Sequence, residues 1–216
     1  MNFQDFLQYV PNLIPVELPA NLAHLKMAPK GRLEELRNVD LKTKNPRIAA
    51  VMMLFYPKND ETHLVLIVRN AYNGVHSSQI AFPGGKYEIS DINFEETALR
   101  ETEEEVGVSL EKIEIIKKFT PVYIPPSNFL VHPFLGIAKE ELSFYPDIRE
   151  VADIIELPLS VFLDDEIIME TTLSTSYAID ILVPAFNIQN HIVWGATAMI
   201  LSELREVLKI TFAENL

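Results

Sequence analysis

Residues 93–107 have the sequence NFEETALRETEEEVG, which carries the signals of a helix at both ends. Asn93 can cap the first turn, with Glu96 at the third helical position. Thr97 to Val106 follow in helical register, and Gly107 can end the helix because glycine adopts the left-handed conformation at little cost. We therefore predict a glutamate-rich helix that begins after Asn93 and ends at Gly107.

Three of the glutamates in this helix are spaced so that their carboxylates share one face. Glu101, Glu104 and Glu105 stand at i, i+3 and i+4, the positions that lie side by side on a helix. Three hard oxygen donors suit Mg²⁺ or Mn²⁺, whereas without a cation Glu101 and Glu105 would repel each other. The spacing favours a metal site.

The competing interpretation is a solvated acidic face, which is the usual role of an isolated run of glutamates. Two neighbouring features favour the metal site instead. Apolar and small residues give the helix a second face for the core, and the Gly84-Gly85 turn lies about fifteen residues upstream. We expect the glycine turn and the acidic helix to form one pocket.

Composition limits the classes of protein that fit this helix. The chain has 216 residues, a net charge of −13 and no cysteine, so disulfides, thiolate nucleophiles and cysteine-bound metals are excluded. The acidic balance argues against polymeric nucleic acid as a partner, although divalent cations can still bring a small phosphorylated ligand to an acidic site. There is no signal-peptide pattern, and the longest apolar run, Ile48 to Tyr56, is far shorter than the roughly 20 residues of a membrane span. We expect a cytoplasmic protein without a membrane segment.

Strands surround the predicted helix on both sides. Arg47 to Tyr56 and Thr62 to Arg69 are β-rich runs separated by a polar turn, Pro57 to Glu61, and predict a hairpin. Further strands are predicted at Lys112–Phe119, Leu130–Ala138, Val151–Leu157, Ile167–Thr172 and Ser176–Val183, with a last helix at Ala196–Lys209. This order predicts an α/β (α+β) sandwich with a mixed sheet in residues 46–216, preceded by a helical N-terminal extension in residues 1–45.

The stretch from Gly85 to Val108, GKYEISDINFEETALRETEEEVGV, resembles the Nudix box, Gly-x5-Glu-x7-Arg-Glu-(apolar)-x-Glu-Glu-x-Gly-(apolar). This chain departs from that pattern at three points. Asp91 stands in place of the first glutamate, eight residues rather than seven separate it from Arg100, and Thr102 replaces the usual apolar residue. The second half of the motif, Arg100 to Gly107, is intact.

The resemblance implies a Nudix-type α/β/α sandwich and water attack at phosphorus with Mg²⁺ or Mn²⁺. It assigns Glu101, Glu104 and Glu105 as metal ligands, with the Gly85 carbonyl completing the coordination. Arg100 would orient the glutamates, and Glu104 or Glu105 would accept the proton of the attacking water. Because a further carboxylate outside the box often takes part in this family, Glu150 is a candidate, against the alternative of an ordinary surface acid.

The flanking sequence is similar to one Nudix branch, the coenzyme A pyrophosphatases. The similarity lies in residues 76–86 (HSSQIAFPGGK), in residues 97–101 and in residues 192–198 (IVWGATA). It implies cleavage of coenzyme A or its derivatives into 3′-phosphoadenosine 5′-phosphate and the 4′-phosphopantetheine portion. A homodimer is common in the resembled family.

The upstream half of that branch signature is altered in this chain. Gly74 stands where that branch has an arginine, and Ser78 stands where it has a glycine. The missing arginine is a candidate phosphate contact. Arg69 or Lys86 either compensates for it or is an ordinary strand-end or loop charge exposed to water. His76 lies near the box and is assigned to hydrogen bonding in its loop. Arg69, His76 and Lys86 are the candidate substrate-binding residues.

Two other features have competing interpretations. Residues 123–129, YIPPSNF, predict a rigid loop that either lines a pocket mouth or serves only as a structural turn. Trp194 is interpreted as a core anchor in preference to a platform for adenine.

Three functional alternatives remain open at this stage. The first is a Nudix diphosphatase for ADP-ribose, dinucleotides or noncanonical nucleoside triphosphates, because the box supplies phosphate chemistry and not base recognition. The second is a non-catalytic nucleotide-binding module, and the third is an acidic domain that binds partners through charge.

Overall fold

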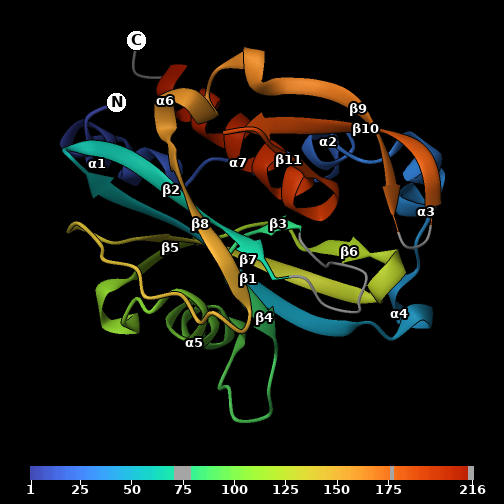
Figure 1. Cartoon of the computed structure of the whole chain (residues 1–216), viewed down its shortest axis with the longest axis horizontal. Helices are drawn as coiled ribbons and strands as arrows, with labels where there is room; N and C mark the ends of the chain where they lie inside the picture. The colour runs from blue at the N-terminus through green and yellow to red at the C-terminus, as the bar shows by residue number, and fades with distance from the viewer. Residues whose placement is uncertain (71–78, 176–177, 214–216) are drawn as a thin grey trace.

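The structure is a computed structural model that describes residues 1–70, 79–175 and 178–213. A mixed β-sheet lies between two layers of helices (Figure 1). Helix α5 (Phe94–Val106) covers one face, and α7 (Gly195–Ala213) covers the other together with the N-terminal helices. The predicted sandwich with a mixed sheet is therefore confirmed.

The larger sheet has eight strands within the described residues, five of them in the order β3-β2-β1-β7-β5 and three paired beside this path. Strand β4 pairs with β1, β6 with β7, and β8 with β2. The β1–β7 pair is parallel and the other pairs are antiparallel. The strands are β1 (Arg47–Lys58), β2 (Glu61–Arg69), β3 (Ile80–Ala81), β4 (Gly84–Lys86), β5 (Glu114–Lys118), β6 (Val122–Ile124), β7 (Phe129–Ile137) and β8 (Val151–Pro158).

Strands β1 and β2 form the predicted hairpin, with a tighter turn than the sequence suggested. Lys58 pairs with Glu61, so only Asn59 and Asp60 form the turn, with φ values of 49° and 62°. Two successive residues with positive φ match the right-handed twist of the flanking strands. Strand β1 therefore continues through Pro57, which was predicted to lie in the turn.

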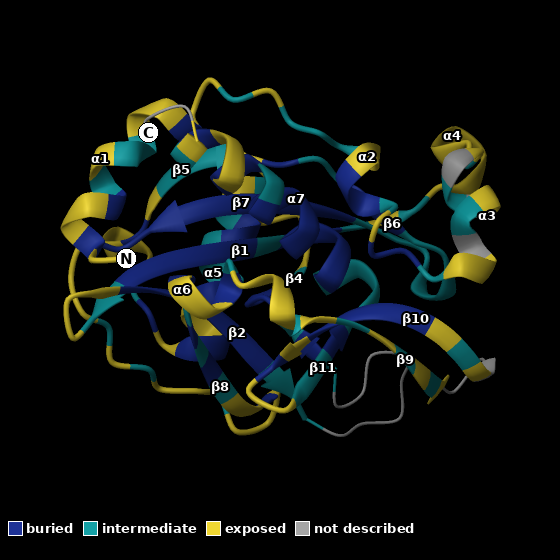
Figure 2. Ribbon diagram, turned by 90° about the horizontal axis from the view of Figure 1, so that it is seen from above, coloured by how far each residue is buried: buried dark blue, intermediate teal, exposed yellow. Residues whose placement is uncertain are grey.

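Side chains of β1 and β2 alternate between two cores, one on each face of the sheet. Met53, Phe55 and Leu66 belong to the core under α7. Met52 and Ile67 belong to the core under α5. Because a core lies on each face of the sheet, successive residues of both strands are buried, which explains their almost continuously apolar sequences. Figure 2 shows the same strands as the most deeply buried part of the fold.

A second, antiparallel sheet consists of β9 (Ile168–Thr175), β10 (Ala178–Ile188) and β11 (His191–Trp194). The predicted strand Ser176–Val183 was wrong at its end, because β10 continues to Ile188 and pairs there with β11. The pattern analysis missed β11 and β6, which are short strands. The predicted last helix is confirmed as α7, which extends further at both ends.

Residues 1–45 form the helices α1 (Phe3–Leu13), α2 (Asn21–His24), α3 (Leu33–Arg37) and α4 (Leu41–Lys44), with a 3-10 turn at Lys30–Arg32. Phe3, Phe6 and Leu13 are buried in the core under α7. Lys117 of β5 donates to the carbonyl of Ile14 at 2.7 Å, at the end of α1. The segment is thus helical, as predicted, and shares its core with the rest of the chain.

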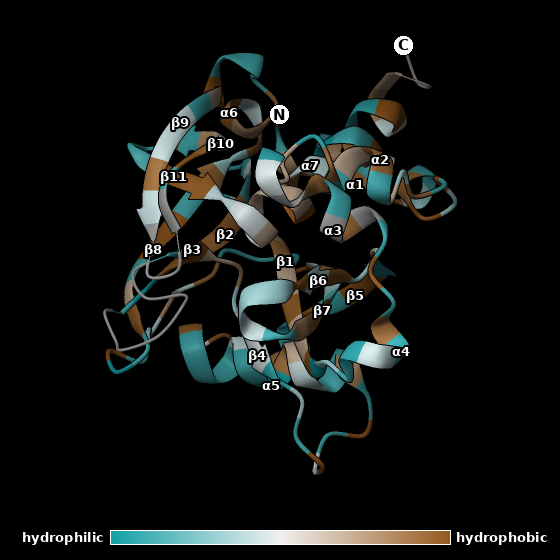
Figure 3. Ribbon diagram, turned by 90° about the vertical axis from the view of Figure 1, so that its right-hand side faces the viewer, coloured by the Kyte–Doolittle hydropathy of each residue, from teal (hydrophilic) through white to brown (hydrophobic). Residues whose placement is uncertain are grey.

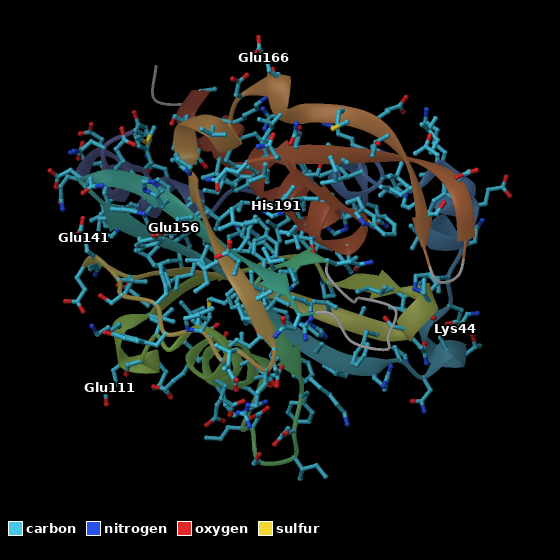
Figure 4. All side chains as sticks on the ribbon, in the orientation of Figure 1. Lys44, Glu111, Glu141, Glu156, Glu166 and His191 are labelled. Carbon is cyan, nitrogen blue, oxygen red and sulfur yellow. The ribbon has the colours of Figure 1, made fainter. Side chains whose placement is uncertain are left out.

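The remaining short elements are α6 (Leu159–Phe162) and the 3-10 turns Leu110–Lys112, Pro125–Ser127 and Asp165–Ile167. Acidic side chains are spread around the periphery, where Figure 4 labels Glu111, Glu141 and Glu166. Among the described helices, none is long and apolar enough to span a membrane.

Candidate active site

Helix α5 begins and ends as the sequence predicts. The Asn93 side chain accepts a hydrogen bond from the Glu96 N–H at 2.9 Å, and Gly107 ends the helix with φ of 71°. Ala98 and Val106 are buried against the sheet. Thr102, which replaces the usual apolar residue of the box, is also buried, and its hydroxyl donates to the Ala98 carbonyl at 2.6 Å. Glu105 is buried on this side of the helix as well, whereas Glu104 is exposed and Glu101 lies between the two.

Arg100 connects three acidic side chains. Its Nε and Nη2 donate to the two oxygens of Asp91 at 2.8 and 3.0 Å. Its Nη1 donates to Glu101 at 2.9 Å and to Glu104 at 3.1 Å, and Nη2 also reaches the Lys86 carbonyl at 3.2 Å. Arg100 is therefore hydrogen-bonded to Asp91 on one side and to Glu101 and Glu104 on the other.

Asp91 gives Arg100 a fixed partner, a role that the sequence did not show. It is buried, and the Thr97 hydroxyl donates to its Oδ2 at 2.8 Å. The hydrogen bonds from Arg100 hold the pKa of Asp91 well below its usual range, because they stabilise the charged form. The extra residue in the spacer and the shorter side chain still place this carboxylate against Arg100.

Glu105 lies in a different environment from the other two glutamates. It is buried, its Oε2 accepts from the Gly84 N–H at 2.8 Å, and its Oε1 accepts from Arg69 at 3.2 Å. Burial raises the pKa of Glu105 to about 7, although Arg69 and the Gly84 N–H oppose the shift. This carboxylate is therefore fixed against the glycine turn.

Gly85 on β4 lies directly against the carboxylate of Glu101. A Cβ at this position would collide with that carboxylate, so glycine allows Glu101 to lie where it does against β4. Burial raises the pKa of Glu101, while Arg100 opposes the shift. The glycine turn and the acidic helix thus form one site, as predicted.

The three glutamates line a single cavity, but each carboxylate has its own partner in this structure. Glu101 and Glu104 are bound to Arg100, and Glu105 is bound to Arg69 and Gly84. Within the described residues, no three acidic or histidine side chains are already arranged around one point as a metal site. Glu104 is 59% exposed and is the most free of the three to turn towards a cation.

The cavity has a volume of about 530 Å³, within the usual range for a small-molecule site. Arg69, Lys86 and Glu150 line it together with the α5 glutamates, so the structure brings these sequence candidates together. Arg69 is bound to Glu105, whereas Lys86 and Glu150 are exposed. His76 and the altered positions 74 and 78 lie outside the described residues.

Two predictions about the cavity wall had opposite outcomes. Tyr123, Pro125 and Phe129 line the cavity, which supports the pocket-mouth interpretation of that segment. However, Tyr123 belongs to β6 and Phe129 begins β7, so only the part between them is a loop. Trp194 is partly buried at the cavity wall, so its interpretation as a core anchor was wrong.

Part of the cavity wall comes from segments that no sequence motif marks. Pro29 and Leu36 of the N-terminal region, Ile181 of β10, and Met199 and Ile200 of α7 all line the cavity. These are ordinary apolar residues without a motif. Their place at the site depends on packing between segments far apart in the chain, which a local pattern does not reveal.

Comparisons with known proteins show the family of this chain. The family model of the NUDIX domain matches residues 46–167. A protein called uncharacterized Nudix hydrolase NudL from Photorhabdus laumondii is 33% identical over 77% of this chain and 87% of its own length. A NudL protein from Yersinia enterocolitica is 31% identical over 77% of this chain and 84% of its own length.

Solved structures share the fold at low sequence identity. A Nudix hydrolase from M. smegmatis, RenU, has a TM-score of 0.54 at 18% identity, covering 76% of this chain and 87% of that one. The NUDIX domain of Shewanella oneidensis NrtR, in complex with ADP ribose, has a TM-score of 0.51 at 18% identity, covering 81% and 97%. The chain belongs to the Nudix family. It is a Nudix hydrolase, one of the pyrophosphatases that act on nucleoside diphosphate derivatives.

Proposed function

We propose that this enzyme is a divalent-metal-dependent hydrolase of coenzyme A or its derivatives. It cleaves the diphosphate linkage to release 3′-phosphoadenosine 5′-phosphate and the 4′-phosphopantetheine portion. The observation that carries the proposal is the placement of Glu101, Glu104 and Glu105 in one cavity against Gly84 and Gly85. The choice of coenzyme A is supported by the two flanking sequences similar to that branch, of which residues 79–82, 84–86 and 194–197 line the cavity.

The donor set fits Mg²⁺ or Mn²⁺. The acidic groups at the site offer carboxylate oxygens, which both ions prefer, and Gly85 leaves room for a close approach between β4 and Glu101. Glu101, Glu104, Glu105 and the Gly85 carbonyl would hold the ion, with Glu150 as a further acid on the same cavity. Such an ion neutralises the diphosphate and lowers the pKa of a bound water.

The residues of the chain prepare the rest of the reaction. Arg100, fixed by Asp91, holds the carboxylates of Glu101 and Glu104 at one side of the cavity. Glu104 or Glu105 accepts the proton from the attacking water as the new P–O bond forms and the bridging oxygen departs. Arg69 and Lys86 contribute positive charge to the same wall and are assigned to phosphate binding.

The test is product analysis. The protein is incubated with coenzyme A and Mg²⁺ or Mn²⁺, beside ADP-ribose, NADH and a Glu104→Gln variant, and products are identified by mass spectrometry. Release of 3′-phosphoadenosine 5′-phosphate and 4′-phosphopantetheine, lost in the variant, is the expected result. Cleavage of ADP-ribose or NADH alone would keep the diphosphatase chemistry and reject coenzyme A, and no cleavage of any substrate would favour a binding module.

A further inference from the structure

Two arginines neutralise the carboxylates of the site, and they are held in different ways. Arg100 donates to both oxygens of Asp91, at 2.8 and 3.0 Å, and to the Lys86 carbonyl at 3.2 Å. Arg69 has a single ion pair among the described residues, from its Nη1 to Oε1 of Glu105 at 3.2 Å. Arg100 is therefore fixed by a partner outside the three glutamates, whereas the charged end of Arg69 depends on Glu105.

Arg69 is anchored at its backbone and exposed at its guanidinium. It is the last residue of β2, its N–H donates to the Gln79 carbonyl at 3.0 Å, and it pairs with Val151 of β8. Its side chain is 24% exposed, against 3% for Glu105, and both residues line the cavity. The guanidinium can therefore turn into the cavity by rotation of its side-chain bonds while the strand stays in place.

Arg69 covers the outer oxygen of the Glu105 carboxylate. The other oxygen, Oε2, accepts from the buried Gly84 N–H at 2.8 Å, which leaves Oε1 as the one that faces Arg69. Glu105 lies on α5, the helix below β1 and β4 in Figure 3, where much of α5 has the hydrophilic colour. A divalent cation on Oε1 would be close to the guanidinium, and two like charges repel strongly in a partly buried site. A cation and Arg69 therefore compete for one carboxylate oxygen.

The balance of charge in the cavity is compatible with an exchange of partners. The described charged residues of its lining are five glutamates and three cations: Glu88, Glu101, Glu104, Glu105 and Glu150, with Arg69, Lys86 and Arg100. A divalent cation would replace the charge that Arg69 gives to Glu105 and would leave the guanidinium available to another anion. A diphosphate is such an anion, because a guanidinium can donate two parallel hydrogen bonds to phosphate oxygens.

We propose that Arg69 is an exchangeable counter-ion of Glu105: a divalent cation takes its place, and its charge then passes to the diphosphate of the substrate. This inference rests on the proposed function for the metal and the diphosphate, and it does not require that the substrate be coenzyme A. Removal of Arg69 should therefore strengthen metal binding and weaken substrate binding. A side chain that only held Glu105 in position would weaken both when removed.

The test is calorimetric titration of Mn²⁺, without substrate, into the wild type, Arg69→Ala and Lys86→Ala. Arg69→Ala is expected to bind Mn²⁺ about tenfold more tightly, because no guanidinium competes for Glu105. Lys86→Ala is the matched control, since Lys86 lines the same cavity, is exposed and forms no ion pair with the described glutamates. Its effect on Mn²⁺ affinity should stay below about threefold, because solvent and salt screen an exposed charge.

Substrate kinetics give the second readout. At saturating Mg²⁺, the KM for coenzyme A should rise about tenfold in Arg69→Ala, because a phosphate contact is lost. If only ADP-ribose is cleaved, its KM is measured instead, since both compounds contain a diphosphate. Arg69→Gln removes the charge but keeps a polar side chain, and it should give the same two changes if the alanine variant does not fold.

The outcomes separate this inference from the proposed function. Weaker Mn²⁺ binding in Arg69→Ala would mean that Arg69 only positions Glu105, and it would overturn the exchange. Unchanged affinity, or an equal gain in Lys86→Ala, would overturn it as well, because the guanidinium would then not compete specifically. If the wild type binds no Mn²⁺, the metal dependence of the proposed function fails and the exchange fails with it.

Discussion

At the scale of single residues, the chemistry of the site depends on which groups hold each carboxylate. Arg100 is bound on one side by Asp91 and on the other by Glu101 and Glu104, so its position determines where those glutamates lie. Glu105 is held independently, by the Gly84 N–H and Arg69. Substitutions at Asp91 should therefore disturb Glu101 and Glu104 more than Glu105.

The Asp91→Asn substitution is expected to destabilise the enzyme by about 2 kcal/mol at neutral pH, because it removes the most deeply buried of the three carboxylates that pair with Arg100. The folded-state pKa of Asp91 lies below its unfolded value. Its contribution to stability is therefore present above the ordinary pKa of a carboxyl and is lost as the pH falls below it. Urea denaturation at pH 7 and pH 3 measures the difference, which should shrink at pH 3. An equal difference at both pH values would contradict the account.

At the scale of elements, the site depends on how closely β4 approaches its neighbours on both sides. Gly84 has φ of 149°, and a Cβ there would collide with the backbone of Ala50 and Val51 on β1. At Gly85 the same atom would meet the end of the Glu101 side chain. Gly84 therefore allows β4 to lie close to β1, and Gly85 allows the Glu101 carboxylate to lie against β4.

The Gly84→Ala and Gly85→Ala substitutions should have different effects, the first on stability and the second on metal binding. We expect Gly84→Ala to lower the free energy of unfolding by about 3 kcal/mol, because rigid backbone atoms must move and the φ value is strained for alanine. Gly85→Ala should fold with little loss, because a flexible side chain can move aside, but Mn²⁺ affinity should fall about tenfold. Thermal denaturation and Mn²⁺ titration measure the two effects. The reverse pattern would show that the assignment is wrong.

We expect the packing of β7 against α5 to depend on pH, because His132 of β7 lies between them. Its ring lies 4.4 Å from the ring of Phe94 on α5, and both of its nitrogens are buried without a hydrogen-bond partner among the described residues. Burial, with a smaller effect of Lys118, lowers the pKa of His132 to about 4. The folded state therefore favours the neutral ring.

Because its folded-state pKa is lowered, His132 should cost the enzyme stability as the pH falls from about 6.5 to about 4, where only the unfolded chain takes up the proton. One group contributes at most about 1.4 kcal/mol per pH unit. The measurement is the difference in unfolding free energy between the wild type and His132→Phe across this range. The difference should grow in favour of the variant as the pH falls, and parallel curves would contradict the prediction.

At the scale of the whole molecule, the features that could be predicted from the sequence are those that depend on residues close together in the chain. The caps of α5, the apolar runs of β1 and β2 and the periodic start of α7 are encoded by neighbouring residues, and the structure has them in place. Strand β11 and the position of Trp194 depend on pairing with β10, so they were missed or misassigned. The contact between Asp91 and Arg100, and the apolar cavity wall that α3 and α7 contribute, also arise only when separate segments pack together.

Glu203 on α7 joins three parts of the chain. It is fully buried, and it accepts hydrogen bonds from the Ala20 N–H at 2.9 Å and from the Thr120 hydroxyl at 2.6 Å. Its Oε2 lies 3.3 Å from Nε2 of His24. This carboxylate therefore connects the N-terminal segment to the rest of the fold. We propose that this segment ends at residue 45.

The Glu203→Ala substitution is expected to destabilise the enzyme by about 3 kcal/mol, because it leaves buried donors without an acceptor. Glu206→Ala on the same helix is the matched control, since Glu206 forms a surface ion pair with Lys26 worth less than about 1 kcal/mol. Guanidinium denaturation of both variants measures the contrast. Equal losses would mean that Glu203 does not hold the N-terminal segment in place.

The central claim is that the α5 glutamates perform metal-dependent hydrolysis of a diphosphate. The most direct test is the initial rate of coenzyme A cleavage against Mg²⁺ concentration for the wild type, Glu104→Gln and Glu103→Gln. Glu103 is exposed on the same helix and does not line the cavity, so it is the matched control. We predict saturable Mg²⁺ dependence in the wild type and in Glu103→Gln, and a loss of about 100-fold or more in Glu104→Gln. Turnover that needs no divalent ion, or equal rates in the two variants, would contradict the account.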